Sequence, residues 1–259
     1  MENNLNIALI QTDTLWENID KNLESLSIKL DSIPDDVDMI ILPELFSTGF
    51  TMNAKGIAET MQGKSLVWML DKARKKDCLI LGSLLIADNE NFYNRLVVAF
   101  PEGEIKYYDK RHLFSYAGED EVFAQGADRL VFNYKGFTIC PLICYDLRFP
   151  VWARNTEDID LLIYVANWPN ARMFAWDTLL KARAIENLCY SVGVNRVGVD
   201  QNNLAYTGHS AVNNAFGETL LDFEEGKQEV KWITLKKDHI TTTRNRFRFL
   251  DDRDEFEII

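Results

Sequence analysis

Residues 7–10 (Ile-Ala-Leu-Ile) and residues 39–42 (Met-Ile-Ile-Leu) are two short apolar runs near the start of the chain. Runs that are apolar at every position are typical of parallel strands buried on both faces. Between them lie five apolar residues whose spacings of 4, 3, 4 and 3 positions follow the helical period: Ile19, Leu23, Leu26, Leu30 and Ile33. The stretch from residue 7 to residue 42 therefore predicts a β-α-β unit, and Pro43 ends its second strand.

The alternation of strands and helices continues beyond this unit. Leu66, Met69, Leu70 and Ala73 form a second helical stripe and residues 78–87 are again strand-like, so the chain begins as an α/β fold. Further strands are expected at residues 94–100, 104–108, 130–134, 137–143, 161–166 and 191–199, with a long helix at 174–190 and a hairpin around 214–218. Mixed sheets with helices outside them predict a layered α/β sandwich.

The composition is that of an ordinary globular chain with an acidic balance. Of 259 residues, 40 are acidic and 28 are basic, which gives a formal net charge of −12, and 47% are hydrophobic. A nucleic acid or an anionic membrane would require a basic face, so neither is expected as a partner. No apolar run reaches the roughly 18 residues of a transmembrane helix, and residues 1–4 lack the features of a secretory signal. We expect a cytoplasmic protein with one domain over residues 1–259, because no repeat or linker divides the chain.

The cysteines and histidines give no framework for a metal site or a disulfide scaffold. The four cysteines (Cys78, Cys140, Cys144 and Cys189) form no C-x-x-C pair, and the three histidines are scattered along the chain. We therefore expect neither a metal nor another cofactor. A cysteine in an apolar run is usually a small buried hydrophobe, and only Cys144 has neighbours that suggest chemistry.

Three segments place a reactive side chain just after a predicted strand. Glu44 lies in residues 42–46, Lys110 in residues 109–114 and Cys144 in residues 143–150. Loops at the carboxyl ends of buried strands are where α/β folds place their sites. Each segment alone is weak evidence, because a glutamate after a strand or a Lys-Arg pair is usually a solvated surface feature. A thiol, however, needs a neighbouring base or positive charge to become a nucleophile. Glu44 could supply the base and Lys110 the positive charge.

Together these residues resemble the Glu-Lys-Cys triad of the nitrilase (carbon–nitrogen hydrolase) superfamily. Glu44, Lys110 and Cys144 follow one another with spacings of 66 and 34 positions, which are typical of that family. Glu119, seven residues before Gly126, occupies the position of the family's second glutamate. Residues 165–169 (Val-Ala-Asn-Trp-Pro), 183–187 (Arg-Ala-Ile-Glu-Asn) and 207–210 (Thr-Gly-His-Ser) continue the resemblance, which covers residues 5–240.

The resemblance implies a fold, a mechanism and an assembly. The fold is a four-layer αββα sandwich. In the mechanism Cys144 attacks an amide carbonyl, Glu44 takes and returns the proton, and Lys110 and the backbone N–H of Tyr145 hold the oxyanion. Glu119 orients Lys110. The superfamily commonly forms homodimers or higher homo-oligomers, and residues 240–259 are expected to form a tail used in subunit contacts.

Residues 110–114 (Lys-Arg-His-Leu-Phe) and 144–152 (Cys-Tyr-Asp-Leu-Arg-Phe-Pro-Val-Trp) resemble the bacterial ω-amidase branch. This branch releases ammonia from the side-chain amide of 2-oxoglutaramate, 2-oxosuccinamate or analogues such as succinamate. Arg148 is a candidate to bind the remote carboxylate of such a substrate, with a structural salt bridge to Asp146 or Glu186 as the alternative. Further candidates for substrate contacts are Phe46, Tyr116, Asn167 and Trp168, with Phe174 as another possible aromatic wall.

The sequence leaves open other hypotheses about the substrate class, the activator of the thiol and the presence of catalysis. The substrate class would instead be N-carbamoyl amino acids or aliphatic nitriles in neighbouring branches of the superfamily. A Cys-His hydrolase would pair Cys144 with His112 or His209, because imidazole is a common activator of thiols. A non-catalytic member of the same fold would serve as a binding module, which the intact Glu44, Lys110, Glu119 and Cys144 argue against.

Overall fold

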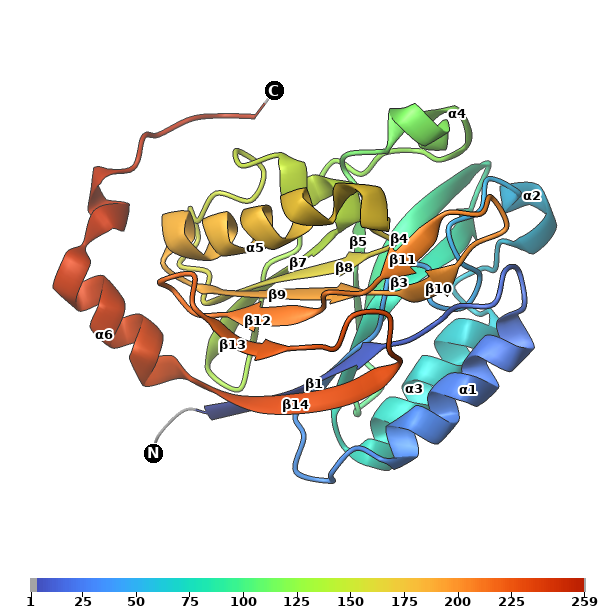
Figure 1. Cartoon of the computed structure of the whole chain (residues 1–259), viewed down its shortest axis with the longest axis horizontal. Helices are drawn as coiled ribbons and strands as arrows, with labels where there is room; N and C mark the ends of the chain where they lie inside the picture. Colours follow the sequence, from blue (N-terminus) through green and yellow to red (C-terminus); the bar gives the residue numbers. More distant parts are fainter. Residues whose placement is uncertain (1–3, 259) are drawn as a thin grey trace.

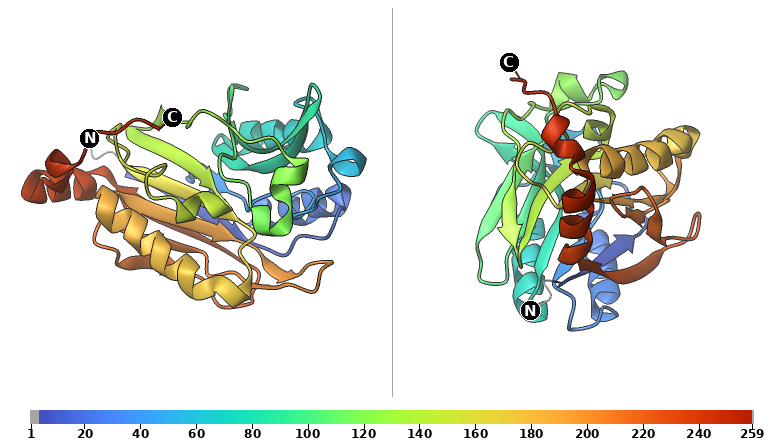
Figure 2. Two further views of the ribbon diagram at one scale, coloured as in Figure 1. Left: turned by 90° about the horizontal axis from the view of Figure 1, so that it is seen from above. Right: turned by 90° about the vertical axis from the view of Figure 1, so that its left-hand side faces the viewer.

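A computed structural model of the chain describes residues 4–258. Residues 1–3 and 259, which the single-domain prediction also included, lie outside the described part. Two six-stranded sheets face each other, with helices packed on their outer sides (Figure 1). The views from above and from the side in Figure 2 show the same succession of layers. The prediction of a four-layer αββα sandwich is confirmed.

The first sheet contains the two strands that open the sequence. Its order is β14-β1-β2-β3-β4-β5, and its strands are β1 (Asn4–Gln11), β2 (Met39–Ile41), β3 (Leu79–Asp88), β4 (Asn91–Ala99), β5 (Ile105–Asp109) and β14 (Glu229–Lys236). The strands β1, β2 and β3 are parallel, with Ile7 opposite Met39 and Met39 opposite Leu79. Helices α1 (Ile19–Asp31) and α3 (Lys64–Lys76) carry the two apolar stripes and cover the outer face.

The second sheet contains the strands that lead to Cys144 and Asn167. Its order is β13-β12-β9-β8-β7-β6, and its strands are β6 (Phe132–Tyr134), β7 (Phe137–Ile143), β8 (Leu161–Ala166), β9 (Tyr190–Asn195), β12 (Ala211–Asn213) and β13 (Thr219–Asp222). The strands β7, β8 and β9 are parallel. Helix α5 (Met173–Asn187) covers the outer face through Trp176 and Leu180.

Burial on both faces explains why the first strands are apolar at every position. Successive residues of a strand point to opposite faces. Leu9, Ile41 and Leu81 face the second sheet and join the core between the sheets. Their neighbours Ala8, Ile40 and Ile80 face the helices and pack with Leu23, Leu26 and Met69. Both clusters are fully buried, so each of these three strands stabilises two layers at once.

The structure differs from the predicted boundaries at a few points. The long helix ends at Asn187 because Leu188 adopts a left-handed conformation with φ of 43°. The predicted strand 191–199 divides into β9 and β10 (Val197–Val199), and β10 pairs with β11 (Ala205–Thr207) in a separate hairpin. The remaining short elements are α2 (Ala54–Ile57), η1 (Ser115–Ala117), α4 (Glu119–Val122), η2 (Cys144–Arg148) and η3 (Asn170–Arg172).

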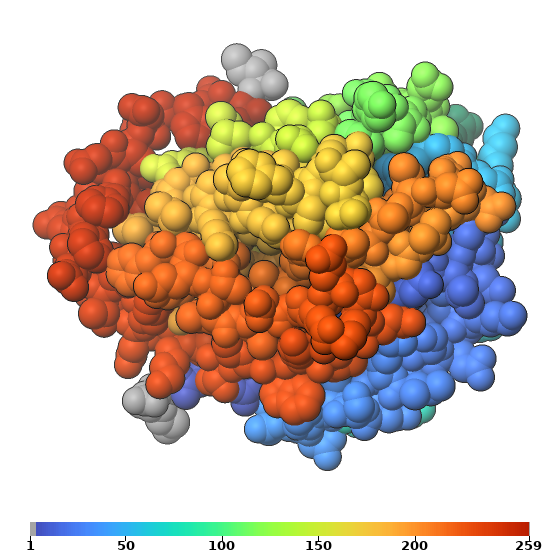
Figure 3. Space-filling view, in the orientation of Figure 1, coloured from blue at the N-terminus to red at the C-terminus, as the bar shows by residue number. Residues whose placement is uncertain are grey.

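The carboxyl-terminal segment forms helix α6 (Lys237–Phe247) and a short turn η4 (Phe249–Asp252) at one edge of the molecule (Figure 3). Part of it binds the chain's own body: Arg244 donates to the carbonyl of Leu188 at 3.0 Å and pairs with Asp160 at 3.3 Å. The tail therefore packs in part on its own chain, whereas Phe249 is exposed, and the use of the tail in subunit contacts stays a prediction. No helix within residues 4–258 has the length and apolar character needed to cross a membrane.

Candidate active site

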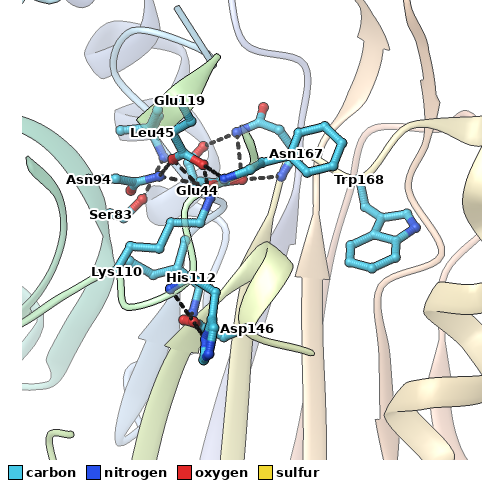
Figure 4. Close-up of polar contacts among 12 residues, drawn as sticks. Glu44, Leu45, Ser83, Asn94, Lys110, His112, Glu119, Asp146, Asn167 and Trp168 are labelled. Carbon is cyan, nitrogen blue, oxygen red and sulfur yellow. Dashed lines mark hydrogen bonds and ion pairs between the residues drawn. The ribbon is translucent and has the colours of Figure 1, made fainter. Parts of the chain in front are cut away.

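Four strand ends meet at one edge of the sandwich, and they bring together residues that are far apart in the sequence. Glu44 follows β2, Lys110 follows β5, Cys144 follows β7 and Asn167 follows β8. Lys110 and Cys144 line a cavity of about 370 Å³, and Glu44 is buried beside Lys110. Figure 4 shows the polar contacts at this place. The spatial meeting of these segments matches the expectation from their position after strands.

Lys110 is fully buried between two carboxylates. Its Nζ donates to Glu44 Oε1 at 2.9 Å and to Glu119 Oε1 and Oε2 at 3.0 and 2.9 Å. Burial alone would lower the pKa of this ammonium, but Glu119 and Glu44 together raise it above its ordinary value. Burial raises the pKa of Glu119, and the charge of Lys110 opposes that rise. Glu119 also accepts from the backbone N–H of Phe114 at 2.6 Å, so it fixes both Lys110 and the loop after it.

Four N–H groups converge on the carboxylate of Glu44. Asn94 and Lys110 donate to Oε1 at 2.8 and 2.9 Å, and the backbone and side chain of Asn167 donate to Oε2 at 2.7 and 3.3 Å. The next residue, Leu45, has φ of 45°, and its backbone N–H donates to Ser83 Oγ at 2.8 Å. Glu44 is therefore held in one orientation from both sheets, as a proton acceptor in catalysis requires.

Cys144 occupies a strained turn at the end of β7. Its φ of 45° lies in the left-handed region, which a non-glycine residue adopts only where the surroundings impose it. Burial raises the pKa of the Cys144 thiol well above its usual range; the charge of Glu44 adds to this effect and that of Lys110 opposes it. The resting side chain is therefore a thiol, which needs a proton acceptor at the moment of attack. Tyr145, in the first turn of η2, leaves its backbone N–H outside the intrahelical bonds.

Six aromatic residues are among those that line the cavity: Trp16, Phe50, Phe114, Tyr145, Trp168 and Tyr206. Two arginines also line it. The guanidinium of Arg148 lies 4.9 Å from the centre of the Trp168 ring, and that of Arg172 lies 5.0 Å from the Phe114 ring. Among residues 4–258 neither has an acidic partner within ion-pair distance.

The structural salt bridge considered for Arg148 is wrong. The two acids proposed for it are engaged elsewhere: Asp146 accepts from His112 and Tyr108, and Glu186 pairs with Arg183 at 2.9 Å.

Three of the predicted substrate contacts are also absent from the cavity lining. Phe46 is 1% exposed and packs in the core between the first sheet and its helices, because its ring meets Trp68 at 5.9 Å instead of the cavity. Tyr116 is 87% exposed on η1 and is not part of the cavity lining, although its ring lies 5.8 Å from that of Phe114, which is. Phe174 is likewise exposed and outside the lining. Asn167 and Trp168 do line the cavity, and Asn167 also binds Glu44.

The two histidines considered as thiol activators lie outside the cavity lining. His112 Nδ1 is 2.8 Å from Asp146 Oδ1, and the ring stacks on Phe149 with a centroid distance of 3.7 Å. His209 faces Asp177 at 3.1 Å. The geometry around Cys144 thus favours Glu44 over either imidazole. In the part of the chain that the structure describes, no group of three or more His, Cys, Asp or Glu residues is arranged to hold a metal ion.

Sequence reasoning missed several residues of the site. Asn94, which binds both Glu44 and Glu119, was detectable only as a polar residue at the start of a predicted strand, followed by Arg95 and five apolar residues. Glu17 lines the cavity, with its carboxylate accepting from Thr51 and Asn53. The β10–β11 hairpin contributes Asp200, Asn202, Leu204 and Tyr206 to the lining, and no motif marks these residues because loop shape alone brings them there.

Comparison with known proteins gives consistent matches over almost the whole chain. The family model described as carbon-nitrogen hydrolase matches residues 6–245. The protein named omega-amidase YafV of Yersinia enterocolitica is 41% identical, covering 98% of this chain and 99% of the relative. The 2-oxoglutaramate amidase of Bacillus subtilis (strain 168) is 32% identical, covering 86% and 87%. A crystal structure of a CN-hydrolase superfamily protein from Xanthomonas campestris, with an arsenic adduct in its active site, superposes with a TM-score of 0.96 at 40% identity, covering 98% and 99%.

Proposed function

The chain belongs to the carbon–nitrogen hydrolase family, and we propose that it acts within this family as an ω-amidase. It is a hydrolase of carbon–nitrogen bonds in non-peptide amides. Its substrate is the side-chain amide of a small dicarboxylic acid monoamide, of the 2-oxoglutaramate, 2-oxosuccinamate or succinamate type. The names of the relatives from Yersinia enterocolitica and Bacillus subtilis support this substrate class.

In the first half of the reaction, the Cys144 sulfur attacks the amide carbonyl carbon while Glu44 takes the thiol proton. The carbonyl oxygen becomes an oxyanion, stabilised by Lys110 and by the backbone N–H of Tyr145. Glu44 then gives its proton to the amide nitrogen, the carbon–nitrogen bond breaks, and ammonia leaves. The acyl group stays on Cys144 as a thioester. In the second half, Glu44 takes a proton from water, the hydroxide adds to the thioester carbon, and the thiol is restored with the free acid.

The contacts of Lys110 explain how its charge becomes available to the oxyanion. In the resting site its three N–H groups all point at carboxylates. When Glu44 takes the thiol proton, that carboxylate becomes neutral and its bond with Lys110 weakens, because charge-assisted hydrogen bonds are roughly twice as strong as neutral ones. The negative charge reappears on the oxyanion at the same time. Lys110 therefore exchanges one anionic acceptor for another, while Glu119 keeps it in place.

The single observation that carries the substrate class is the pair of arginines in the cavity without acidic partners. The chain has a net charge of −12, yet Arg148 and Arg172 rest on aromatic rings and not on carboxylates. The carboxylates lining the cavity are occupied by neutral donors: Asp200, for example, accepts from Tyr206 and from two backbone N–H groups. A guanidinium in a largely apolar cavity is suited to bind the remote carboxylate of a monoamide.

The experiment measures ammonia release from 2-oxoglutaramate, succinamate, succinamide, N-carbamoyl-β-alanine and an aliphatic nitrile. The proposal expects the monoamides of dicarboxylic acids to have the highest kcat/KM. A preference for N-carbamoyl-β-alanine would assign the protein to the carbamoyl hydrolases, which also bind a carboxylate, and a preference for the nitrile would assign it to the nitrilases. No turnover of any compound would favour the inactive binding module, against which the complete set of buried catalytic groups argues.

Assembly and location stay predictions. We expect a homodimer or higher homo-oligomer, as the resemblance to the superfamily implies, and the exposed aromatic side chains Tyr116, Phe174 and Phe249 are accessible for subunit contacts. The exposed Phe249 lies in the tail of residues 240–258, and residue 259 lies outside the described part. A cytoplasmic location without nucleic-acid or membrane partners rests on the acidic composition.

A further inference from the structure

We propose that Asp146 is a positioning residue that joins the loop carrying Lys110 to the turn carrying Cys144. The inference rests on the proposed function of those two residues, but it concerns a carboxylate outside the triad. Asp146 lies two positions after Cys144, is 0% exposed, and does not line the cavity. Its contact with His112 is drawn in Figure 4, below Lys110.

Four hydrogen bonds reach Asp146 from both sides of the site. On one oxygen it accepts from the backbone N–H of His112 at 3.1 Å, and the His112 ring nitrogen Nδ1 lies 2.8 Å away. On the other oxygen it accepts from the Tyr108 hydroxyl at 2.8 Å and from the backbone N–H of Ile143 at 2.9 Å. Tyr108 and His112 lie two residues before and two residues after Lys110, and Ile143 directly precedes Cys144. The carboxylate of Asp146 thus connects the segment that carries Lys110 to the segment that carries Cys144.

Tyr108 extends this connection. Its hydroxyl accepts from the backbone N–H of Arg111 at 3.0 Å and from the Trp152 indole at 3.1 Å while it donates to Asp146. Burial and the charge of Asp146 raise the pKa of Tyr108 well above its usual range, so the hydroxyl keeps the proton that it donates. β5 and β7 belong to different sheets. The hydrogen bonds of Asp146 to Tyr108, His112 and Ile143 therefore connect the loop after β5 to the turn after β7.

The hydrogen bonds of Asp146 help to hold Cys144 in its left-handed backbone conformation. A left-handed cysteine costs about 1–2 kcal/mol relative to ordinary backbone, and it relaxes unless bonds on either side restrain it. The bond from Asp146 to the N–H of Ile143 restrains the side that precedes Cys144. An error of about 1 Å between reacting groups can reduce a rate about 100-fold, so loosening this network should affect turnover far more than substrate binding.

The test compares Asp146→Asn with a matched control, Asp160→Asn. Asp160 is also 0% exposed and also accepts a backbone N–H, from Thr138 at 2.8 Å, but it lies beside Lys237 and Arg244, away from the cavity. We expect Asp146→Asn to lower kcat for amide hydrolysis by about 10- to 100-fold with KM changed less than about twofold. Asp160→Asn should keep kcat within about twofold even if its melting temperature falls further.

A second readout needs no substrate. The rate constant for alkylation of Cys144 by iodoacetamide should fall in Asp146→Asn and not in Asp160→Asn, so a wrong substrate class would leave this result intact. If Asp146→Asn does not fold, Tyr108→Phe takes its place, with Tyr134→Phe, whose hydroxyl binds Asp38 away from the site, as its control. The proposal would be overturned if the folded Asp146→Asn or Tyr108→Phe variant kept the wild-type kcat and the wild-type alkylation rate. It would also be overturned if the variant and its control lost kcat and alkylation rate to the same extent.

Discussion

Lys110 Nζ lies 2.9 Å from Glu44 Oε1, although the two residues are 66 positions apart in the chain. The contact exists because β2 and β5 belong to one sheet and end at the same edge. Both side chains are fully buried, so the ion pair is isolated from water and its charges act strongly on nearby groups. Such a buried pair does little for stability on balance, and its position beside Cys144 indicates a catalytic purpose.

The two glutamates should respond differently to the same substitution. Glu44→Gln removes the proton acceptor and should lower kcat at least about 100-fold. Glu119→Gln keeps the acceptor and loosens only the hold on Lys110, so we expect a smaller loss. Steady-state ammonia release, with circular dichroism to verify folding, measures both. Wild-type turnover in Glu44→Gln would require a different general base.

The buried thiol of Cys140 should make stability depend on alkaline pH. Burial raises its pKa from 9.0 to about 12. Above pH 9 the unfolded chain loses this proton while the folded chain keeps it, so the free energy of unfolding falls as pH rises toward 12. The contribution is about 1.36 kcal/mol per pH unit. Denaturant unfolding at pH 9, 10 and 11 should show a shallower fall in Cys140→Ala, and parallel curves for the two proteins would contradict this prediction.

Arg148 should determine the preference for a substrate with a free carboxylate. A charge-assisted contact is typically worth about 1.5–3 kcal/mol, so wild type should favour succinamate over succinamide by about 10- to 150-fold in kcat/KM. Arg148→Met should lose most of this preference while retaining activity on succinamide. Arg129→Met is a suitable control, because Arg129 binds Glu157 and backbone carbonyls away from the cavity. An unchanged preference in Arg148→Met would shift the carboxylate-binding role to Arg172.

The protein should behave as a homo-oligomer in solution. Light scattering at working concentrations should give at least twice the chain mass of 29.9 kDa. The exposed Phe249 provides a variant: Phe249→Ser should weaken association if the tail takes part, because it removes apolar surface from the contact. A mass equal to one chain in the wild type would contradict the assembly.

The sequence predicted most of the architecture because its main elements have clear periodicity. Residues 161–166, apolar throughout, match β8, and the stripe from Leu66 to Ala73 lies on the buried side of α3. The division at Arg196 was not predictable, because that buried arginine turns the chain through bonds to Asp13 and Thr14, which lie 183 and 182 positions away. The same limit applies to Phe46 and Tyr116: proximity in sequence to a reactive residue does not fix which way a side chain points.

Mass spectrometry of rapidly quenched enzyme with succinamate tests the central claim most directly, because it identifies the residue that carries the acyl group. The account predicts one succinyl group on the peptide containing Cys144, formed as ammonia is released. Cys144→Ala should form no adduct and release no ammonia, whereas Cys140→Ser, changed four positions earlier in β7, should form the adduct as wild type does. A succinyl group on another residue, or ammonia release by folded Cys144→Ala, would contradict the account.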